Sequence, residues 1–128
     1  MMEIKTHTMV SEKMVGKPVL LAKNHSVITL ESCEEMVADE SGLIHGGFSF
    51  GLADYAAMLA INHPFVVLGS ATTNFVAPVK LGETMIASAQ VIEEDGKKRV
   101  VTVKVKVEDR IVLRADLTCF VLDNHVLL

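Results

Sequence analysis

Residues 46–61, GGFSFGLADYAAMLAI, decide the fold. Read as a helix, this stretch carries apolar side chains on every side, and a helix that is hydrophobic all round is buried. At 1.5 Å per residue it would extend about 24 Å, which is short for a membrane span of about twenty apolar residues. We therefore expect a central helix, buried on all sides, around which the rest of the chain is wrapped.

Asp54 is the one charged residue in this stretch. An aspartate is a poor helix former in mid-helix and is rarely buried without a partner. Leaving its carboxylate in apolar surroundings costs several kcal/mol or raises its pKa. Two interpretations follow: Asp54 caps or bridges a structural element, or it is the reactive group of an active site. No other residue in the chain competes for the second role.

Length and composition narrow the class of protein. The 128 residues fit one compact domain, residues 1–128, and a hydrophobic content of 50% provides an ample core. Twelve basic and sixteen acidic residues give a net charge of −4, so we expect no broad basic face and no nucleic-acid partner. The first residues, MMEIKTHTMV, lack the charged start and apolar run of a signal peptide. We expect a cytoplasmic protein that does not enter a membrane.

The cysteines and histidines show no ligand spacing. Cys33 and Cys119 are too far apart in the sequence for a metal motif or a disulfide framework. The five histidines are scattered along the chain: His7, His25, His45, His63 and His125. We expect no metal site.

After the helix, the chain reads as antiparallel strands. The helix is expected to end near Asn62-His63-Pro64, because a residue before proline resists the α conformation. Strands are expected over residues 65–76, 83–94, 99–108 and 111–122, with a hairpin at Asp95-Gly96. Valines alternate with threonine and lysines in 99–108, which indicates a sheet with one buried and one solvated face.

The signals before the helix are weaker. Residues 24–31, NHSVITLE, favour a strand, and residues 33–37 are expected to stay extended. The ADESG segment, 38–42, reads as a loop. Residues 1–19 are compatible with a strand, a short helix or a frayed N-terminal arm. The expected architecture is α+β, with four or five antiparallel strands curled around a single buried helix.

Gly46 and Gly47 open the helix. The first N–H groups of a helix have no internal partners, and together with the helix dipole they can bind a negatively charged oxygen. A carbonyl oxygen that gains charge during acyl transfer is such a group. The alternative is that the two glycines only allow close packing of the helix on the sheet.

The spacing between these glycines and Asp54 has a consequence for assembly. Asp54 lies eight residues beyond Gly46, about 12 Å along the helix axis. One carbonyl group cannot touch both on the same helix, so an enzyme that uses both needs two subunits lying antiparallel across a two-fold axis. The sequence therefore predicts a dimer if it predicts an enzyme.

Residues 45–56, HGGFSFGLADYA, resemble the motif of hot-dog-fold acyl-CoA thioesterases, particularly the phenylacetate-pathway and 4-hydroxybenzoyl-CoA types. The likeness extends over about residues 26–122 and includes FVAPVKLGE, residues 75–83. It implies the hot-dog fold, a curved antiparallel sheet wrapped around one long helix. It also implies hydrolysis of a small or medium acyl-CoA to free acid and CoA, by a homodimer or a dimer of dimers, without any cofactor beyond the CoA of the substrate.

The resemblance assigns roles around the thioester. Asp54 would be the nucleophile or the general base for water, and the Gly46 amide, with Gly47, would polarise the carbonyl. His45 would orient the loop or the carbonyl, although a packed structural histidine fits equally well. The remaining candidates lie on the following strand, where a hydroxyl could hold the Asp54 carboxylate or the water: Ser70, Thr72 and Thr73.

Substrate binding involves further residues. Many relatives carry an Asn in the loop before H-G-G, whereas this chain has Asp39, which cannot donate as an amide does. Phe48 would line an acyl pocket, unless it is simply part of the core. Lys80, Lys97 and Lys98 are candidates for the CoA phosphates, with ordinary solvated turn charges as the alternative reading.

Other functions remain open on the same fold. A non-catalytic acyl-CoA-binding module that acts as a sensor is the first alternative, although we see no helix-turn-helix or other effector segment in the chain. A hydratase or dehydratase would place its His and Asp or Glu differently from this H-G-G motif. A purely structural dimer gives no reason to bury Asp54. The acyl group, the pathway, and the choice between dimer and tetramer are not encoded in any visible motif.

Overall fold

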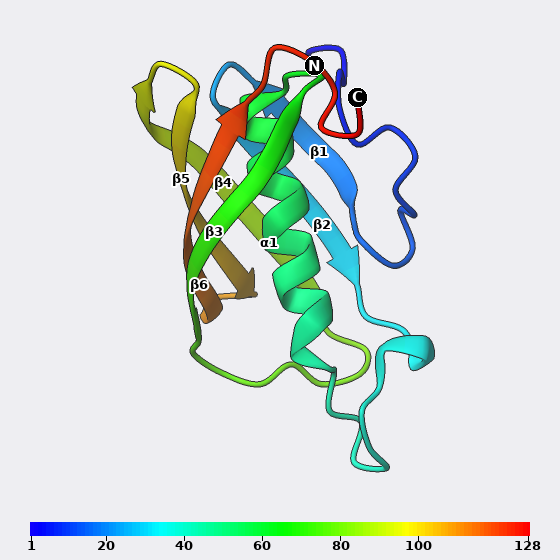
Figure 1. Ribbon diagram of the computed structural model, residues 1–128. Coiled ribbons are helices and arrows are strands. Elements are labelled where there is room, and N and C mark those ends of the chain that lie inside the picture. The colour runs from blue at the N-terminus through cyan, green and yellow to red at the C-terminus, as the bar shows by residue number, and fades with distance from the viewer.

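The computed structural model describes residues 1–128 as a curved antiparallel sheet wrapped around one long helix (Figure 1). The elements in chain order are β1 (Lys17–Ala22), β2 (His25–Glu31), the 3-10 helix η1 (Glu34–Met36), α1 (Gly46–Ile61), β3 (Val66–Phe75), β4 (Thr84–Asp95), β5 (Lys98–Val107) and β6 (Arg110–Val121). Strand order is β1-β2-β4-β5-β6-β3, and all neighbours are antiparallel. The expected α+β class is confirmed, with six strands where four or five were expected.

The sheet has one buried and one solvated face, as the alternation of valines predicted. The inward residues of the two long central strands are all buried: Val101, Val103, Val105 and Val107 on β5, and Leu113, Ala115, Leu117 and Cys119 on β6. On the outer face, Lys104 of β5 stands opposite Arg114 of β6, and both side chains are exposed. Because side chains alternate along a strand, this register fixes which residues meet the helix.

Helix α1 ends where the sequence predicted. Asn62 follows the last helical residue in the left-handed conformation (φ 53°, ψ 51°), and its N–H donates to the Met58 carbonyl at 2.8 Å. Pro64 then prevents the helix from continuing. Within the helix, the Ala56 carbonyl accepts a buried hydrogen bond of 2.6 Å from the Ser26 hydroxyl, which ties α1 to β2.

The expectation that the helix is buried on all sides is wrong for one stripe. Gly47, Gly51 and Asp54, which we call the outer stripe, lie one turn apart on the same side of α1 and are not buried. The edge strands β1 and β3 do not pair with each other, so the curled sheet does not close around α1 (Figure 1). At Gly51, an added Cβ would meet no atom within 4 Å. The outer stripe is therefore open at Gly51 in the single chain.

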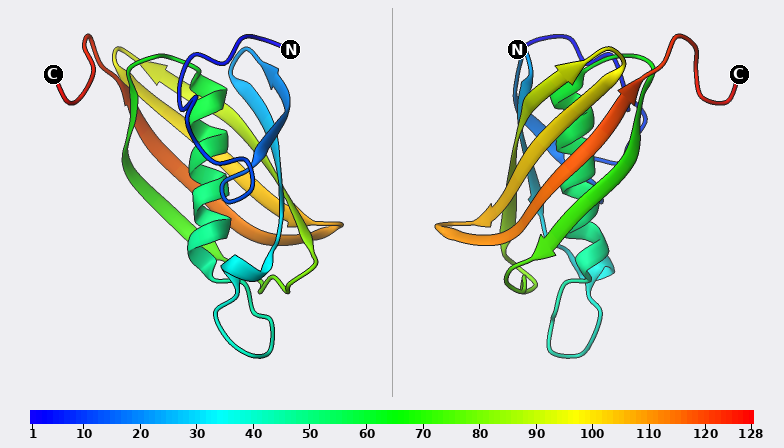
Figure 2. Two further views of the ribbon diagram at one scale, coloured as in Figure 1. Left: turned by 90° about the vertical axis from the view of Figure 1, so that its right-hand side faces the viewer. Right: turned by 60° about the vertical axis from the view of Figure 1, so that its left-hand side comes forward.

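Residues 1–16 form an arm beside α1, and Figure 2 shows this arm crossing in front of the helix in its left-hand view. Its N-terminal end is tied to β1 by a hydrogen bond from the Met2 N–H to the Leu21 carbonyl (3.2 Å). Ile4, Val10, Met14 and Val15 pack against the hydrophobic core. Of the options left open for residues 1–19, the structure selects an arm that passes into a strand at Lys17.

The segment that follows β2 differs from the prediction. Residues 33–37 do not remain extended, because Glu34–Met36 forms a 3-10 turn in which the Met36 N–H donates to the Cys33 carbonyl at 3.0 Å. This turn directs the Met36 side chain into the core, where it is fully buried.

No helix in the structure combines the length and apolar character needed to cross a membrane.

Candidate active site

Asp54 lies in the middle of α1, on its outer stripe, and is partly buried. Its Oδ1 atom is buried and has no hydrogen-bond partner within the protein. Burial raises the pKa of the Asp54 carboxyl above its ordinary value of 3.8, and positive charge on His7 partly offsets this rise. A carboxyl group with these properties can accept a proton more readily than an ordinary surface aspartate. No ion pair joins the Asp54 carboxyl to a side chain of another element.

Asp54 opens onto a cavity of about 500 Å³. The cavity lies between α1, the start of β3, the N-terminal arm and the C-terminal tail. Residues from these four parts line it: Asp54 and Met58 from the helix, Pro64 to Leu68 from β3 and the turn before it, Lys5 to Thr8 from the arm, and His125 and Val126 from the tail. One wall is therefore apolar, while histidines and a lysine stand on the other. Such a mixture suits a ligand with an apolar part and a polar, reactive part.

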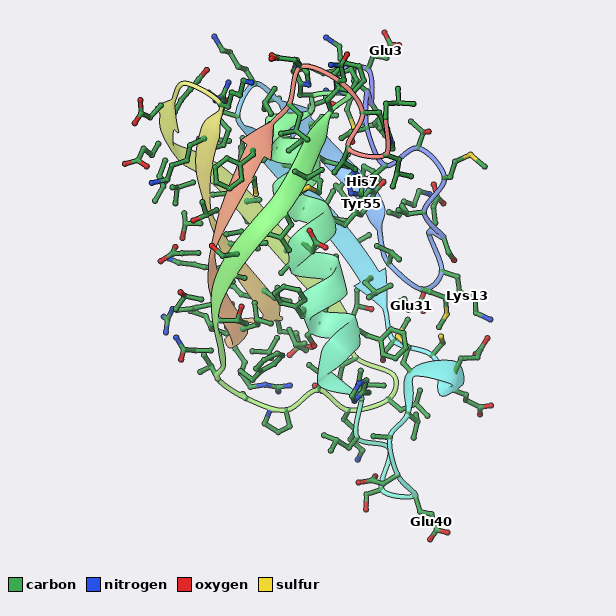
Figure 3. All side chains as sticks on the ribbon, in the orientation of Figure 1. Glu3, His7, Lys13, Glu31, Glu40 and Tyr55 are labelled. Carbon is green, nitrogen blue, oxygen red and sulfur yellow. The ribbon has the colours of Figure 1, made fainter.

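His7 is a site residue that the sequence did not single out. It was one of five scattered histidines, and nothing in its spacing links it to Asp54. The fold brings it to the Asp54 cavity, and Figure 3 shows its ring beside Tyr55 of α1, with ring centroids 6.5 Å apart. Burial lowers the pKa of His7 below its ordinary value of 6.5, and the negative charge of Asp54 opposes this change.

Gly46 and Gly47 form the first turn of α1, as predicted. Their N–H groups have no acceptor within the helix, since the first turn lacks preceding carbonyls. Gly46 also packs closely: an added Cβ would lie 3.2 Å from Cε1 of Phe75 on β3. The proposed packing role and the proposed oxyanion role of Gly46 are thus compatible with one another.

His45 is the N-cap residue of α1, but its side chain makes no capping hydrogen bond. Its ring lies beside Gly47, where an added Cβ would be 3.0 Å from Cδ2, and it meets the ring of Phe48 edge-on at 6.2 Å. Phe48 is half-buried and packs against the core. His45 therefore stands at the helix N-terminus, in reach of a group bound there.

The glycine pair and Asp54 are not brought together within one chain. They lie two turns apart on the same straight helix, about 12 Å along its axis, and neither glycine lines the Asp54 cavity. The chain thus presents the two predicted parts of a site, the N-terminus of α1 and the Asp54 carboxyl group, at separate positions along the helix.

The candidates on β3 are distributed along an edge strand. Ser70 and Thr72 are exposed, whereas Thr73 is half-buried and its hydroxyl oxygen has no hydrogen-bond partner within the protein. Thr73 is thus the second side chain, with Asp54, whose buried oxygen is left without a partner. Of the three hydroxyl residues, Thr73 is the one whose environment favours a bound polar group.

Asp39 lies in the loop that projects beyond the N-terminus of α1, next to Glu40 at the tip (Figure 3). Its Oδ1 accepts hydrogen bonds from the N–H groups of Ser41 (2.9 Å) and Leu43 (3.3 Å). This carboxylate shapes its own loop, and it does not line the Asp54 cavity.

The candidate cations occupy opposite ends of the molecule. Lys80 lies in the connection between β3 and β4, at the same end as Gly46, and its ammonium forms no ion pair (Figure 1). Lys97 and Lys98 lie at the β4–β5 hairpin and pair with Asp123 (2.9 Å) and Glu93 (3.4 Å). Of the three candidate lysines, Lys80 is therefore the one without an ion pair.

The remaining chemistry-bearing groups form no second centre. No three His, Cys, Asp or Glu side chains stand together as a set of metal ligands. Cys119 of β6 is fully buried, and burial together with the nearby Asp54 charge raises the pKa of its thiol to about 12. A thiol with that pKa stays protonated near neutral pH and does not act as a nucleophile.

The chain matches the family model of the thioesterase superfamily over residues 41–113. Two curated relatives match along nearly the whole chain. Methylthioribose-1-phosphate isomerase from Aquifex aeolicus is 45% identical over 95% of this chain, which spans only 27% of that protein. Transcription factor FapR from Thermoanaerobacter sp. is 30% identical over 96% of this chain, which spans 62% of that protein.

Solved structures show the same fold. An uncharacterized protein from Pyrococcus horikoshii is 51% identical with a TM-score of 0.97, covering 98% of this chain and 97% of that one. A sigma28-regulated virulence protein from Campylobacter jejuni is 30% identical with a TM-score of 0.95, covering 98% of this chain and 89% of that one. A mutant of the phenylacetic acid degradation protein PaaI from Thermus thermophilus is 28% identical with a TM-score of 0.79, covering 85% and 95%.

Proposed function

Because the chain belongs to the thioesterase superfamily and has the hot-dog fold, we propose that it hydrolyses an acyl-CoA thioester to the free acid and CoA. The observation that carries this proposal is Asp54, whose Oδ1 is buried without a partner on the open side of the central helix. A carboxyl in that position lowers the stability of the folded chain, so its presence favours a role other than stabilising the fold. Base catalysis on a bound ester is a purpose that fits its cavity and its raised pKa.

The proposed reaction assigns each group one step. The Asp54 carboxylate takes a proton from water as the water oxygen attacks the thioester carbonyl carbon. The carbonyl oxygen gains negative charge and accepts hydrogen bonds from the Gly46 and Gly47 N–H groups at the helix N-terminus. The carbon–sulfur bond then breaks, and the CoA thiolate leaves and is protonated. Direct attack by the Asp54 carboxylate is the alternative, with water hydrolysing the resulting anhydride.

The proposal requires two copies of the chain. Gly46 and Asp54 are about 12 Å apart on one helix, so one carbonyl reaches both only if they come from antiparallel helices of two subunits. Two of the three residues of the outer stripe, Gly47 and Gly51, have no side chain and are not buried, which permits close approach of a second helix. An isologous contact along this stripe would create two equivalent sites. Association of such dimers into a tetramer is compatible with this arrangement.

CoA itself requires cations for its phosphates. Lys80 is our first candidate, because its ammonium forms no ion pair and the residue lies at the same end as the glycine pair. Lys97 and Lys98 would first have to exchange their carboxylate partners for phosphate. The apolar wall of the Asp54 cavity, from Pro64 to Leu68, is the proposed acyl surface.

A second candidate function is a non-catalytic acyl-CoA-binding module. It is favoured by the similarity to FapR, which is named a transcription factor and of which this chain spans 62%. In that case the same cavity would bind a thioester without hydrolysing it, and binding would shift the conformation or the assembly of the chain.

The experiment that separates the two functions is thioester hydrolysis over a panel of acetyl-, phenylacetyl-, benzoyl-, hexanoyl- and palmitoyl-CoA, followed by free-thiol release. Binding of each compound is measured in parallel by calorimetry. Turnover of any member supports the thioesterase and identifies its acyl group. Tight binding without turnover supports the binding module, and the absence of both overturns the acyl-CoA proposal.

A further inference from the structure

The N-terminal arm is attached to the end of the central helix by one side chain. The Asn62 Oδ1 accepts a hydrogen bond of 2.8 Å from the Lys5 N–H, and its Nδ2 donates one of 2.8 Å to the Glu3 carbonyl. Asn62 is also the residue that terminates α1 in the left-handed conformation. A single residue therefore ends the helix and fixes the backbone of the arm on both sides of Ile4.

This attachment sets the position of His7. Thr6, which is buried, and His7 follow directly after Lys5, and the Thr6 hydroxyl lies 2.8 Å from Nδ1 of His7. His7 itself adopts a positive φ of 53°, a left-handed backbone conformation that is uncommon for a non-glycine residue. With Nδ1 engaged by Thr6, Nε2 is the ring atom left for the cavity that His7 shares with Asp54.

The connection between His7 and Asp54 is the cavity that lies between them. The two side chains line one cavity, and no hydrogen bond or ion pair joins them directly. The other titratable groups near Asp54 are Lys5 and His125 in the same cavity and the buried Cys119 on β6. Among all of these, His7 is the group whose positive charge favours the ionised form of Asp54.

We infer that His7 is a positioning residue for Asp54: the arm, clamped by Asn62, holds the imidazole where it controls the pH at which Asp54 ionises. The consequence for hydrolysis rests on the proposed function, since a base works only in its ionised form. Protonated His7 favours the carboxylate that accepts the proton from water, and because burial lowers the pKa of His7 below 6.5, this effect acts at acidic pH. The arm is then part of the site and does more than cover the hydrophobic core.

The inference is tested by following the Asp54 carboxyl by carbon-13 NMR through a pH titration, with the signal assigned by its loss in Asp54→Asn. In His7→Gln, loss of the positive charge is expected to shift the Asp54 titration to higher pH. In Asn62→Gly, glycine keeps the left-handed helix end but removes the clamp, so the same upward shift is expected although Asn62 does not touch Asp54. His125→Gln, on the same cavity, is the control and should leave the titration unchanged.

The outcomes separate this inference from the proposed function. An Asp54 titration that is the same in wild type and His7→Gln overturns the role of His7, whatever the turnover. A shift in His7→Gln without one in Asn62→Gly overturns the role of the clamp. If the chain hydrolyses a thioester, the acid limb of its kcat/KM profile should move in the same direction as the NMR titration. If it hydrolyses none, the NMR measurement still decides the role of His7.

Discussion

Phe75 packs the edge of its ring against the backbone of Gly46, so close that a Cβ on Gly46 would lie 3.2 Å from its Cε1 atom. The contact joins the end of β3 to the first residue of α1. Phe75 is 59% exposed, so much of its ring remains uncovered in the single chain. An aromatic ring therefore packs against the N-terminus of α1 and leaves much of its own surface exposed.

The role of the Gly46 N–H can be tested by a matched pair of variants. Both Gly46→Ala and Gly46→Pro add a Cβ against Phe75, but only proline removes the N–H. Proline is tolerated at the first helical position, and His45 already has the extended conformation (φ −60°, ψ 130°) that precedes proline. We expect Gly46→Pro to have a kcat about 10²–10³ lower than Gly46→Ala in thioester hydrolysis, the usual loss for one oxyanion donor. Equal rates would exclude this N–H from the reaction.

The outer stripe of α1 is predicted to be the contact between two subunits. At Gly51 an added side chain meets no atom of its own chain, so Gly51→Lys should leave the fold of the single chain unchanged. In a dimer with apposed helices, the lysine would enter the contact. We expect analytical ultracentrifugation to show a dimer or tetramer for wild type and Gly51→Ala, and a monomer without hydrolytic activity for Gly51→Lys. A fully active wild-type monomer would contradict the two-chain site.

The raised pKa of Asp54 makes a prediction about stability. Below pH 3.8 the carboxyl is protonated in both the folded and the unfolded chain, so its ionisation does not change the free energy of unfolding. As the pH rises through 3.8, the unfolded chain loses this proton first, and the free energy of unfolding falls until the pH passes the folded-state pKa. The Asp54→Asn variant has no carboxyl at this position, so its free energy of unfolding does not fall in this way. In urea unfolding, we therefore expect the variant to gain stability relative to wild type between acid and neutral pH.

The control for that measurement is Asp116→Asn, which removes an exposed carboxylate on the outer face of β6. The difference in free energy of unfolding between Asp116→Asn and wild type should change little over the same pH range. If Asp54→Asn is instead less stable than wild type at neutral pH, the Asp54 carboxylate stabilises the folded chain. It would then no longer be an unpartnered carboxyl, and the main support for base catalysis by Asp54 would be lost.

Much of the fold could be predicted because its signals are local. The apolar run of residues 46–61, the Pro64 stop and the valine alternation of residues 99–108 each depend on neighbours in the sequence. Each is confirmed in α1 and β5. The prediction of a helix buried on all sides was wrong, because full apolar character does not reveal that a six-stranded sheet leaves one side open.

The site could be predicted only in part. Asp54 was found because a charge within an apolar helix is unusual, and the glycine pair because it starts the same helix. His7 could not be found, because its position depends on two hydrogen bonds between Asn62 and a segment without regular structure. Contacts between residues so distant in the sequence leave no periodic signal in a single chain.

Asp54 is the group that we propose performs the chemistry, and its replacement by asparagine is the decisive experiment. Turnover of the best thioester from the panel is compared between wild type and Asp54→Asn, with binding of the same thioester measured on both proteins. We expect kcat to fall about 10²–10⁴-fold in the variant, the usual contribution of a general base, while binding and folding are retained. A variant that binds the thioester and turns it over within a few-fold of wild type would exclude Asp54 from the reaction.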